Sequence, residues 1–235
     1  MTNSKVFVVI PAAGVGRRMG SSMPKQYLEL TESGPTVLTK SIQVIFQSVR
    51  VEKAIIAVAS DDELHRSSIA SFENSCRVVR GGELRMESVS NCLDTLVDEA
   101  NERDWVMIHD AARPCVRKED IKKLLSCRSS SSAGSILALP VTDTLKLCEG
   151  GTIRGTLDRQ KIWKALTPQI FKFNIIKEAL DKAKNEGKSF TDEAQAVEHL
   201  GEKVEIVLGH TDNIKITFEE DLQLARYFLS SRGEL

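Results

Sequence analysis

The sequence predicts an α/β fold: a doubly wound, mostly parallel sheet with helices on both faces and a projecting β-hairpin arm. Two observations support this. Continuous apolar runs alternate with amphipathic helical patterns along the first part of the chain. After Pro140 this rhythm stops, and two short extended runs flank a Gly-containing turn. With 235 residues in all, a single domain over 1–235 is the expectation.

The strands are expected where β-branched and aromatic residues run without interruption, as in strands covered on both faces. These runs are 6–10, 54–59, 77–80, 105–109 and 135–139, with later strands at 204–208 and 214–216. The helices are expected where apolar residues recur on one face. They begin at about 37, 60, 88, 121, 174, 192 and 218, and Thr191 is expected to cap the helix over 192–200.

The arm is predicted over residues 142–157. The runs 142–147 and 152–157 surround Glu149-Gly150-Gly151, which suits a hairpin turn. These runs offer little apolar surface to bury within their own domain. We therefore expect the arm to pack on a second copy of the chain and to join a homodimer.

Composition excludes several classes. Lys plus Arg (32) nearly balances Asp plus Glu (33), so bulk charge supports neither nucleic-acid nor membrane binding. Five cysteines without a C-x-x-C pair argue against a disulfide framework or a Cys-rich zinc site. The sequence has no membrane-length apolar run and no leader pattern, so a cytoplasmic location is expected.

The stretch 11–25, PAAGVGRRMGSSMPK, carries the strongest chemical signal. Its small residues let the backbone approach a ligand and donate N–H groups, and its three cations suit a polyphosphate. It is not a Walker A loop, and it is not a clean dinucleotide fingerprint, because Met19 holds the third glycine position. Ligands of doubly wound sheets bind beyond the carboxyl ends of the strands. That rule places 11–25, 81–88 and 110–113 around one crevice.

Five motifs in order, over about residues 6–228, resemble the 2-C-methyl-D-erythritol 4-phosphate cytidylyltransferases. They are 11–25, 109–114 (HDAARP), 163–169 (WKALTPQ), 191–194 (TDEA) and 212–217 (DNIKIT). The resemblance implies a Rossmann-like nucleotidyltransferase fold. It also implies transfer of CMP from CTP to 2-C-methyl-D-erythritol 4-phosphate, with release of pyrophosphate, in the non-mevalonate isoprenoid pathway.

The same resemblance implies roles for individual residues. For the nucleotide they are Ala12, Ala13, Gly14, Gly16, Gly82, Glu83, Ser88, Asp110 and Ala111. For catalysis they are Arg18, Lys25 and Lys215. For the acceptor they are Arg113, Thr144 and Lys215, with Arg159 and Thr191 supplied by the neighbouring subunit's arm. Asp110 would lie near Mg²⁺ or another divalent cation. Glu83 departs from the family, since many relatives carry Asp there.

The chemistry explains why cations suffice. The acceptor is a phosphate monoester whose second pKa is about 6, so its oxygen is already an anion and needs no general base. The obstacle is repulsion between the acceptor phosphate and the triphosphate, which preorganised positive charge lowers. His109 is accordingly expected to be structural.

Three other functions stay open at this point. A ribitol 5-phosphate cytidylyltransferase has similar motifs, but Pro-Ala-Ala-Gly and the Ala111-Ala112 pair favour the methylerythritol enzymes. A dehydrogenase would need an acidic residue about 20 positions beyond the glycines, and no complete fingerprint is present. A non-catalytic nucleotide-binding protein would be expected to lose the phosphate-facing cations, which are all retained.

Overall fold

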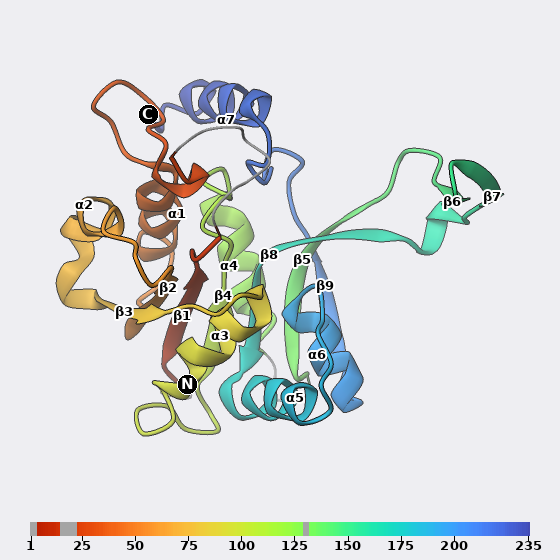
Figure 1. The fold of residues 1–235 in the computed structure, drawn as a ribbon, viewed down its shortest axis with the longest axis horizontal. Helices are drawn as coiled ribbons and strands as arrows, with labels where there is room; N and C mark the ends of the chain where they lie inside the picture. Colours follow the sequence, from red (N-terminus) through yellow and green to blue (C-terminus); the bar gives the residue numbers. More distant parts are fainter. Residues whose placement is uncertain (1–3, 15–22, 129–131) are drawn as a thin grey trace.

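The computed structural model describes residues 4–14, 23–128 and 132–235. Within these ranges the main sheet has seven strands in the order β3-β2-β1-β4-β8-β5-β9 (Figure 1). Every neighbouring pair is parallel except those that β8 makes with β4 and β5. The predicted doubly wound, mostly parallel α/β fold is confirmed.

The elements follow the predicted alternation. The strands of the main sheet are β1 (Val6–Pro11), β2 (Lys53–Val58), β3 (Cys76–Arg80), β4 (Trp105–Ile108), β5 (Gly134–Pro140), β8 (Trp163–Lys172) and β9 (Val204–Leu208). The helices are α1 (Val37–Phe46), α2 (His65–Ile69), α3 (Arg85–Asp94), α4 (Lys118–Ser126), α5 (Phe173–Asn185), α6 (Glu193–Leu200) and α7 (Glu219–Ser231). Short 3-10 turns are η2 (Lys25–Tyr27), η3 (Ala70–Ser75) and η4 (Arg159–Lys161).

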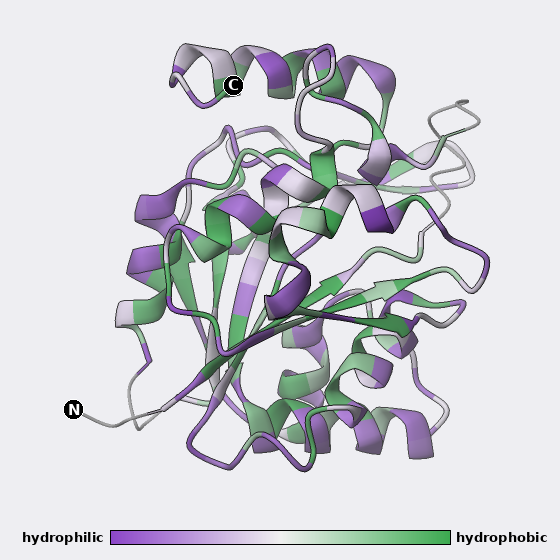
Figure 2. Cartoon of the chain, turned by 90° about the vertical axis from the view of Figure 1, so that its left-hand side faces the viewer, coloured by the Kyte–Doolittle hydropathy of each residue, from purple (hydrophilic) through white to green (hydrophobic). Residues whose placement is uncertain are grey.

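The core lies on both faces of the sheet, and β1 shows how the sequence divides it. Val8 and Ile10 face a cluster that includes residues of α1 and α4. Phe7 and Val9 face a second cluster that includes residues of α3, α5 and α6. Figure 2 shows the strands as largely hydrophobic and the outer helix faces as mixed. Successive side chains of a strand point to opposite faces, so a run apolar at every position requires this double cover.

Strand β8 was not predicted. Its sequence mixes exposed residues, such as Trp163, with a buried half that includes Ile170 and Phe171. Pro168 interrupts the run, and a proline cannot donate to a ladder. The pairing of β8 with β5 shifts register between Ile136 and Ala138. An irregular strand of this kind lacks the simple period on which sequence prediction depends.

Two local predictions were wrong. Residues 214–216 form no strand in the described part of the chain; Ile216 N donates to Ala112 O at 2.9 Å, and the segment otherwise runs as a loop. Asp192, not Thr191, caps α6, because its carboxylate accepts from Gln195 N at 3.0 Å. The Thr191 hydroxyl instead bonds the Gln195 side chain.

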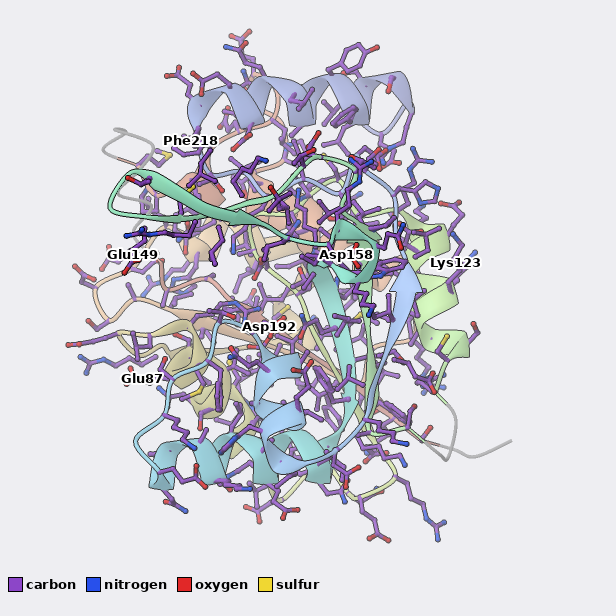
Figure 3. All side chains as sticks on the ribbon, turned by 90° about the vertical axis from the view of Figure 1, so that its right-hand side faces the viewer. Glu87, Lys123, Glu149, Asp158, Asp192 and Phe218 are labelled. Atoms are coloured by element: carbon purple, nitrogen blue, oxygen red, sulfur yellow. The ribbon has the colours of Figure 1, made fainter. Side chains whose placement is uncertain are left out.

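The predicted hairpin is present as β6 (Lys146–Glu149) and β7 (Thr152–Thr156). These strands form a separate two-stranded sheet that extends well away from the main sheet (Figure 1). Figure 3 views the molecule from the side of this arm and labels Glu149 near its tip. Leu147 and Ile153 are 55% and 60% exposed, so within one chain the arm leaves apolar side chains uncovered. Among the described helices, none is long and apolar enough to cross a membrane.

Candidate functional site

One pocket at the carboxyl ends of β1, β3 and β4 brings together most of the predicted site. This is the edge at which ligands of doubly wound sheets bind. Its predicted lining residues are Ala12, Ala13, Gly14, Lys25, Gly82, Glu83, Ser88, Asp110, Ala111 and Lys215. Gly16 and Arg18 lie outside the described residues. Arg113, Thr144, Arg159 and Thr191 do not line this pocket.

The first wall is the segment after β1, and Gln26 fixes it. Its side-chain amide donates to Ala12 O at 2.8 Å and to Gly14 O at 3.1 Å, and the residue is only 4% exposed. Gln26 belongs to the same short turn as Lys25, whose Nζ donates to Ile216 O at 2.7 Å. The turn thus fixes where Lys25 enters the pocket.

The second wall is the turn between β3 and α3. Gly82 N donates to Ser88 Oγ at 3.1 Å, and that hydroxyl donates to Leu84 O at 3.2 Å. A Cβ atom on Gly81 would lie 2.4 Å from the Ala13 Cβ, so only glycine lets the two walls approach this closely. Glu83 is exposed at the rim.

Asp110 forms the charged floor. The residue is 6% exposed and lies two positions after the end of β4. Arg85 Nη2 lies 3.1 Å from Asp110 Oδ1, while Lys215 Nζ and Arg113 Nε lie 2.9 and 3.3 Å from Oδ2. Burial alone would raise the pKa of Asp110, but these three cations hold it well below its usual range. The carboxylate therefore stays ionised and gathers positive charge from three separate segments.

The loop that carries Lys215 is fastened at its start. Asp212 is 5% exposed and accepts hydrogen bonds from Arg117 Nη2 at 2.7 Å and Arg232 Nη1 at 2.9 Å. Asn213 Nδ2 donates to Thr167 O at 2.9 Å. These bonds take the place of the strand pairing that the sequence predicted for 214–216, and they present Lys215 with its side chain 39% exposed.

Arg113 and Arg159 lie apart from the pocket lining. Arg113 is 7% exposed, and its Nη1 donates to Asn213 O at 2.8 Å, beneath the Lys215 loop. Arg159 lies in η4 and donates to Thr142 O, so it belongs to the base of the arm. Thr144 is exposed at the same base.

The assignment of Thr191 to the arm was wrong. Thr191 immediately precedes α6, whose Ala194 and Val197 are fully or almost fully buried in the sheet core. The Thr191 backbone and hydroxyl both bond Gln195 Oε1, at 3.0 and 3.1 Å. It therefore belongs to the part of the chain that packs on the main sheet and not to the hairpin. Figure 3 labels the adjacent Asp192, at the start of α6.

His109 is buried beside the floor and has structural partners on both ring nitrogens. Nε2 lies 3.1 Å from Arg113 O and Nδ1 lies 3.1 Å from Thr167 Oγ1. Burial lowers the pKa of His109 to about 4, from an ordinary value of 6.5. A neutral, fully enclosed ring suits the structural role that the sequence indicated.

The donor set suits a divalent cation bound largely by its substrate. Among residues 4–14, 23–128 and 132–235, no three His, Cys, Asp or Glu side chains are grouped to hold a metal ion by themselves. Asp110 and the exposed Glu83 are the carboxylates among the described lining residues. Mg²⁺ commonly binds through one or two carboxylates together with substrate phosphates, so a floor with one carboxylate fits it.

Sequence reasoning missed Arg85. It lines the pocket and pairs with both Asp110 and Glu193, although it lies outside the motifs that carried the resemblance. Its position three residues after the Gly81-Gly82 turn was the available signal, because ligands of doubly wound sheets bind at the carboxyl ends of the strands. Glu193, in contrast, was within a recognised motif and was read only as part of a helix start.

Comparisons with known proteins identify the family of the chain. Residues 6–231 match the family model for 2-C-methyl-D-erythritol 4-phosphate cytidylyltransferase. Enzymes of that name from Vibrio atlanticus and Haemophilus ducreyi are 43% and 40% identical, each alignment covering 97% of both chains. The crystal structure of the enzyme of that name from Francisella tularensis superposes with a TM-score of 0.82 at 35% identity, covering 96% of this chain and 100% of that one. The chain therefore belongs to the 2-C-methyl-D-erythritol 4-phosphate cytidylyltransferase family and is a nucleotidyltransferase.

Proposed function

We propose that the pocket transfers CMP from CTP to 2-C-methyl-D-erythritol 4-phosphate, releasing pyrophosphate and supplying an isoprenoid precursor. The observation that carries this proposal is the meeting of Lys25 and Lys215 at one floor. Lys25 Nζ bonds the backbone of Ile216, and Lys215 Nζ lies 2.9 Å from Asp110. Two cations from distant segments thus converge where a polyphosphate would lie against the strand ends.

Charge compensation is the chemical task. The acceptor oxygen must approach an α-phosphate that is itself negative, and the repulsion between them is stronger in a cleft from which water is excluded. Lys215 is partly exposed and so is available to both phosphates. Lys25, and Arg18 beyond the described residues, would hold the triphosphate. Among its described lining residues, the pocket offers cations and no buried nucleophile with an adjacent base, as expected for attack by a ready-made anion.

Nucleotide recognition would come from the two walls. The small side chains of Ala12, Ala13 and Gly82 admit a flat base, and Ser88 fixes the turn beneath it. Glu83 would reach the base from the rim, with Asp110 and Ala111 beside the ribose. Gly14 and Gly16 would contribute backbone N–H groups to the phosphates.

Mg²⁺ or another divalent cation is the proposed cofactor, held by Asp110 together with phosphate oxygens. When bound, it would draw the triphosphate oxygens together and stabilise the charge of the leaving pyrophosphate. The protein's own part is to keep Asp110 ionised and fixed in orientation, which its three cationic partners achieve.

A homodimer joined through residues 142–157 is part of the proposal. The exposed Leu147, Ile153 and Leu157 on and beside the arm favour cover by a second copy of the chain. Thr144 and Arg159 at the arm's base would then contribute to an acceptor site, while Thr191 would contribute from the main sheet. In this view 1–235 is one nucleotidyltransferase domain with one dimerisation arm.

A cytoplasmic location is also proposed. All five cysteines lie within the described ranges and are unpaired there. Free thiols are typical of a reducing compartment. No partner among nucleic acids or membranes is proposed, because the overall charge is nearly balanced.

The test is turnover with CTP labelled in its cytosine, offered separately with methylerythritol phosphate and ribitol 5-phosphate. We expect a cytidine diphosphate product and stoichiometric pyrophosphate with the first acceptor. Ribitol phosphate is not favoured, since the relatives matched above carry the methylerythritol name. Exclusive use of ribitol phosphate would overturn the acceptor assignment, and no transfer to either acceptor would overturn the function.

A further inference from the structure

Arg85 joins two carboxylates that belong to different parts of the fold. Its Nε and Nη2 donate to Asp110 Oδ1 at 3.2 and 3.1 Å, and its Nη1 donates to Glu193 Oε1. Asp110 is the floor of the pocket, whereas Glu193 is the first residue of α6. A guanidinium can bridge two acceptors in this way because its donors form a rigid, planar fork.

The burial of the Glu193 carboxylate is energetically unfavourable. It is 1% exposed, and its Oε2 atom accepts no hydrogen bond from any residue that the structure describes. Burying a charged group is unfavourable unless it is paired, and removal of the partner leaves the full penalty. Without Arg85, Glu193 would have to take up a proton or admit water. Either outcome would break the connection from Asp110 to α6.

The Arg85 connection belongs to a hydrogen-bond network that is anchored on β8. Gln169, which is 1% exposed, donates to Asp192 Oδ2 at 2.9 Å and accepts from Ala194 N at 3.1 Å. Thr167 Oγ1 accepts from Asp110 N at 3.0 Å. Both ends of the path Asp110–Arg85–Glu193–α6 are thus fastened to the same strand. This network connects the third and fourth sequence motifs, 163–169 and 191–194.

Arg85 also influences the charge that Lys215 presents. Asp110 Oδ1 bonds Arg85, and Oδ2 is shared by Arg113 and Lys215. With both carboxylates ionised, Asp110 and Glu193 offset two of the three positive charges of Arg85, Arg113 and Lys215, which leaves one net positive charge in this group of five side chains. If Arg85 were lost, Asp110 would draw Lys215 closer, and less positive charge would be available to a phosphate.

We propose that Arg85 and Glu193 are positioning residues that fix the Asp110 carboxylate and hold the start of α6, with Thr191, at the acceptor side of the pocket. This inference rests on the proposed function for its kinetic consequence. Its structural consequence does not depend on that function: the first turn of α6 is held in place by the Arg85–Glu193 pair.

The kinetic test compares Arg85→Ala, Glu193→Gln and the double variant with Arg103→Ala and Glu198→Gln, which change exposed residues. We expect each single variant to raise the acceptor KM by about 10-fold, and the double variant to be within about twofold of the worse single variant, because the two residues act as a unit. The Kd for CTP of Glu193→Gln, measured by calorimetry, is expected to stay within about threefold of wild type. The controls should behave as wild type.

The direction of the change in each variant distinguishes a positioning role from a purely electrostatic one. If the pair acted only through net charge, Arg85→Ala would weaken phosphate binding and Glu193→Gln would strengthen it. A positioning role predicts a raised acceptor KM for both variants. Arg85→Lys adds a further check: it keeps the charge but lacks the fork, so its Kd for CTP should stay close to that of wild type while its acceptor KM is raised.

Amide hydrogen exchange over residues 191–197 supplies the readout that does not need turnover. Arg85→Ala and Glu193→Gln should exchange about 10-fold faster there, and the two control variants should not, because local opening is governed by local contacts. If wild-type protein transferred no CMP, the proposed function would fail while this comparison still stood. The inference would be overturned by unchanged amide exchange over residues 191–197 or by an acceptor KM within about twofold of wild type for Glu193→Gln. It would also be overturned if the increases in acceptor KM of the two single variants multiplied in the double variant.

Discussion

The floor of the pocket and the arm differ in how well a single chain covers them. At the floor, Asp110 is 6% exposed and has cationic partners from three separate segments. On the arm, Ile153 is 60% exposed, and its strand pairs with only one described strand. Among the described residues, the cationic partners of the Asp110 carboxylate all come from a single chain. The arm exposes apolar surface that a single chain does not cover. The comparison separates what one copy of the chain builds for itself from what we propose a second copy supplies.

The largest effect is expected at the floor, for Lys25→Ala. The change removes one preorganised cation, and kcat should fall by about 10²-fold or more. Steady-state pyrophosphate release at saturating CTP and acceptor measures this. Lys122→Ala, on the exposed face of α4, is the matched control and should retain wild-type kcat. A wild-type kcat for Lys25→Ala would show that the floor does not depend on this charge.

The floor should also determine how stability responds to acid. The pKa of His109 is about 4 in the folded protein and 6.5 ordinarily, so between these values the unfolded chain binds a proton that the folded chain does not. Stability is therefore full above about pH 6.5 and falls as the pH drops toward 4, by about 3 kcal/mol in all. Urea unfolding across this range should show a smaller pH slope for His109→Asn. Equal slopes in the two proteins would contradict the role of this buried ring.

On the arm, we expect an introduced charge to lower activity by dissociating the proposed dimer. Ile153→Asp places a carboxylate where we propose that another subunit packs, so the dimer should dissociate and activity at nanomolar protein should fall by about 10-fold. Thr152→Asp places the same charge on the opposite face of β7 and serves as the control. Light scattering and dilution assays measure both. A fully active monomer would refute the shared acceptor site.

The smallest effect is expected at the rim of the pocket. Glu83 is exposed, so Glu83→Asp should change the KM for CTP by less than about threefold, as is usual for solvated charges. Steady-state kinetics with CTP measures it. A change of 10-fold or more would mean that Glu83 contacts the base more closely than its exposure indicates.

The regular parts of the molecule were predictable from the sequence because they have a simple period. The run 6–10 is apolar at every position, and β1 is covered on both faces. Strand β8 escaped prediction because Pro168 and a register shift against β5 break its pattern. The loop at 214–216 was mistaken for a strand because its apolar residues pack against α7 and not within a ladder, as Ile216 shows.

Within the site, glycine-rich and motif residues were predictable, whereas side-chain networks were not. Ala12, Gly82 and Asp110 meet at one pocket as expected from strand-end topology. Arg85 and Glu193 are 108 positions apart in the chain, and nothing in local spacing pairs them. Thr191 was placed on the arm because motif order gives no three-dimensional position. Long-range contacts of this kind are determined by the packing of whole elements.

The most direct test of charge compensation is Lys215→Gln, with kcat and the Kd for CTP measured on the same preparation. If charge compensation drives the reaction, kcat falls by about 10²-fold or more while the Kd for CTP rises by less than about 10-fold, because the charge counts most when the two phosphates meet. A kcat equal to that of wild type, or a loss confined to the Kd, would contradict it.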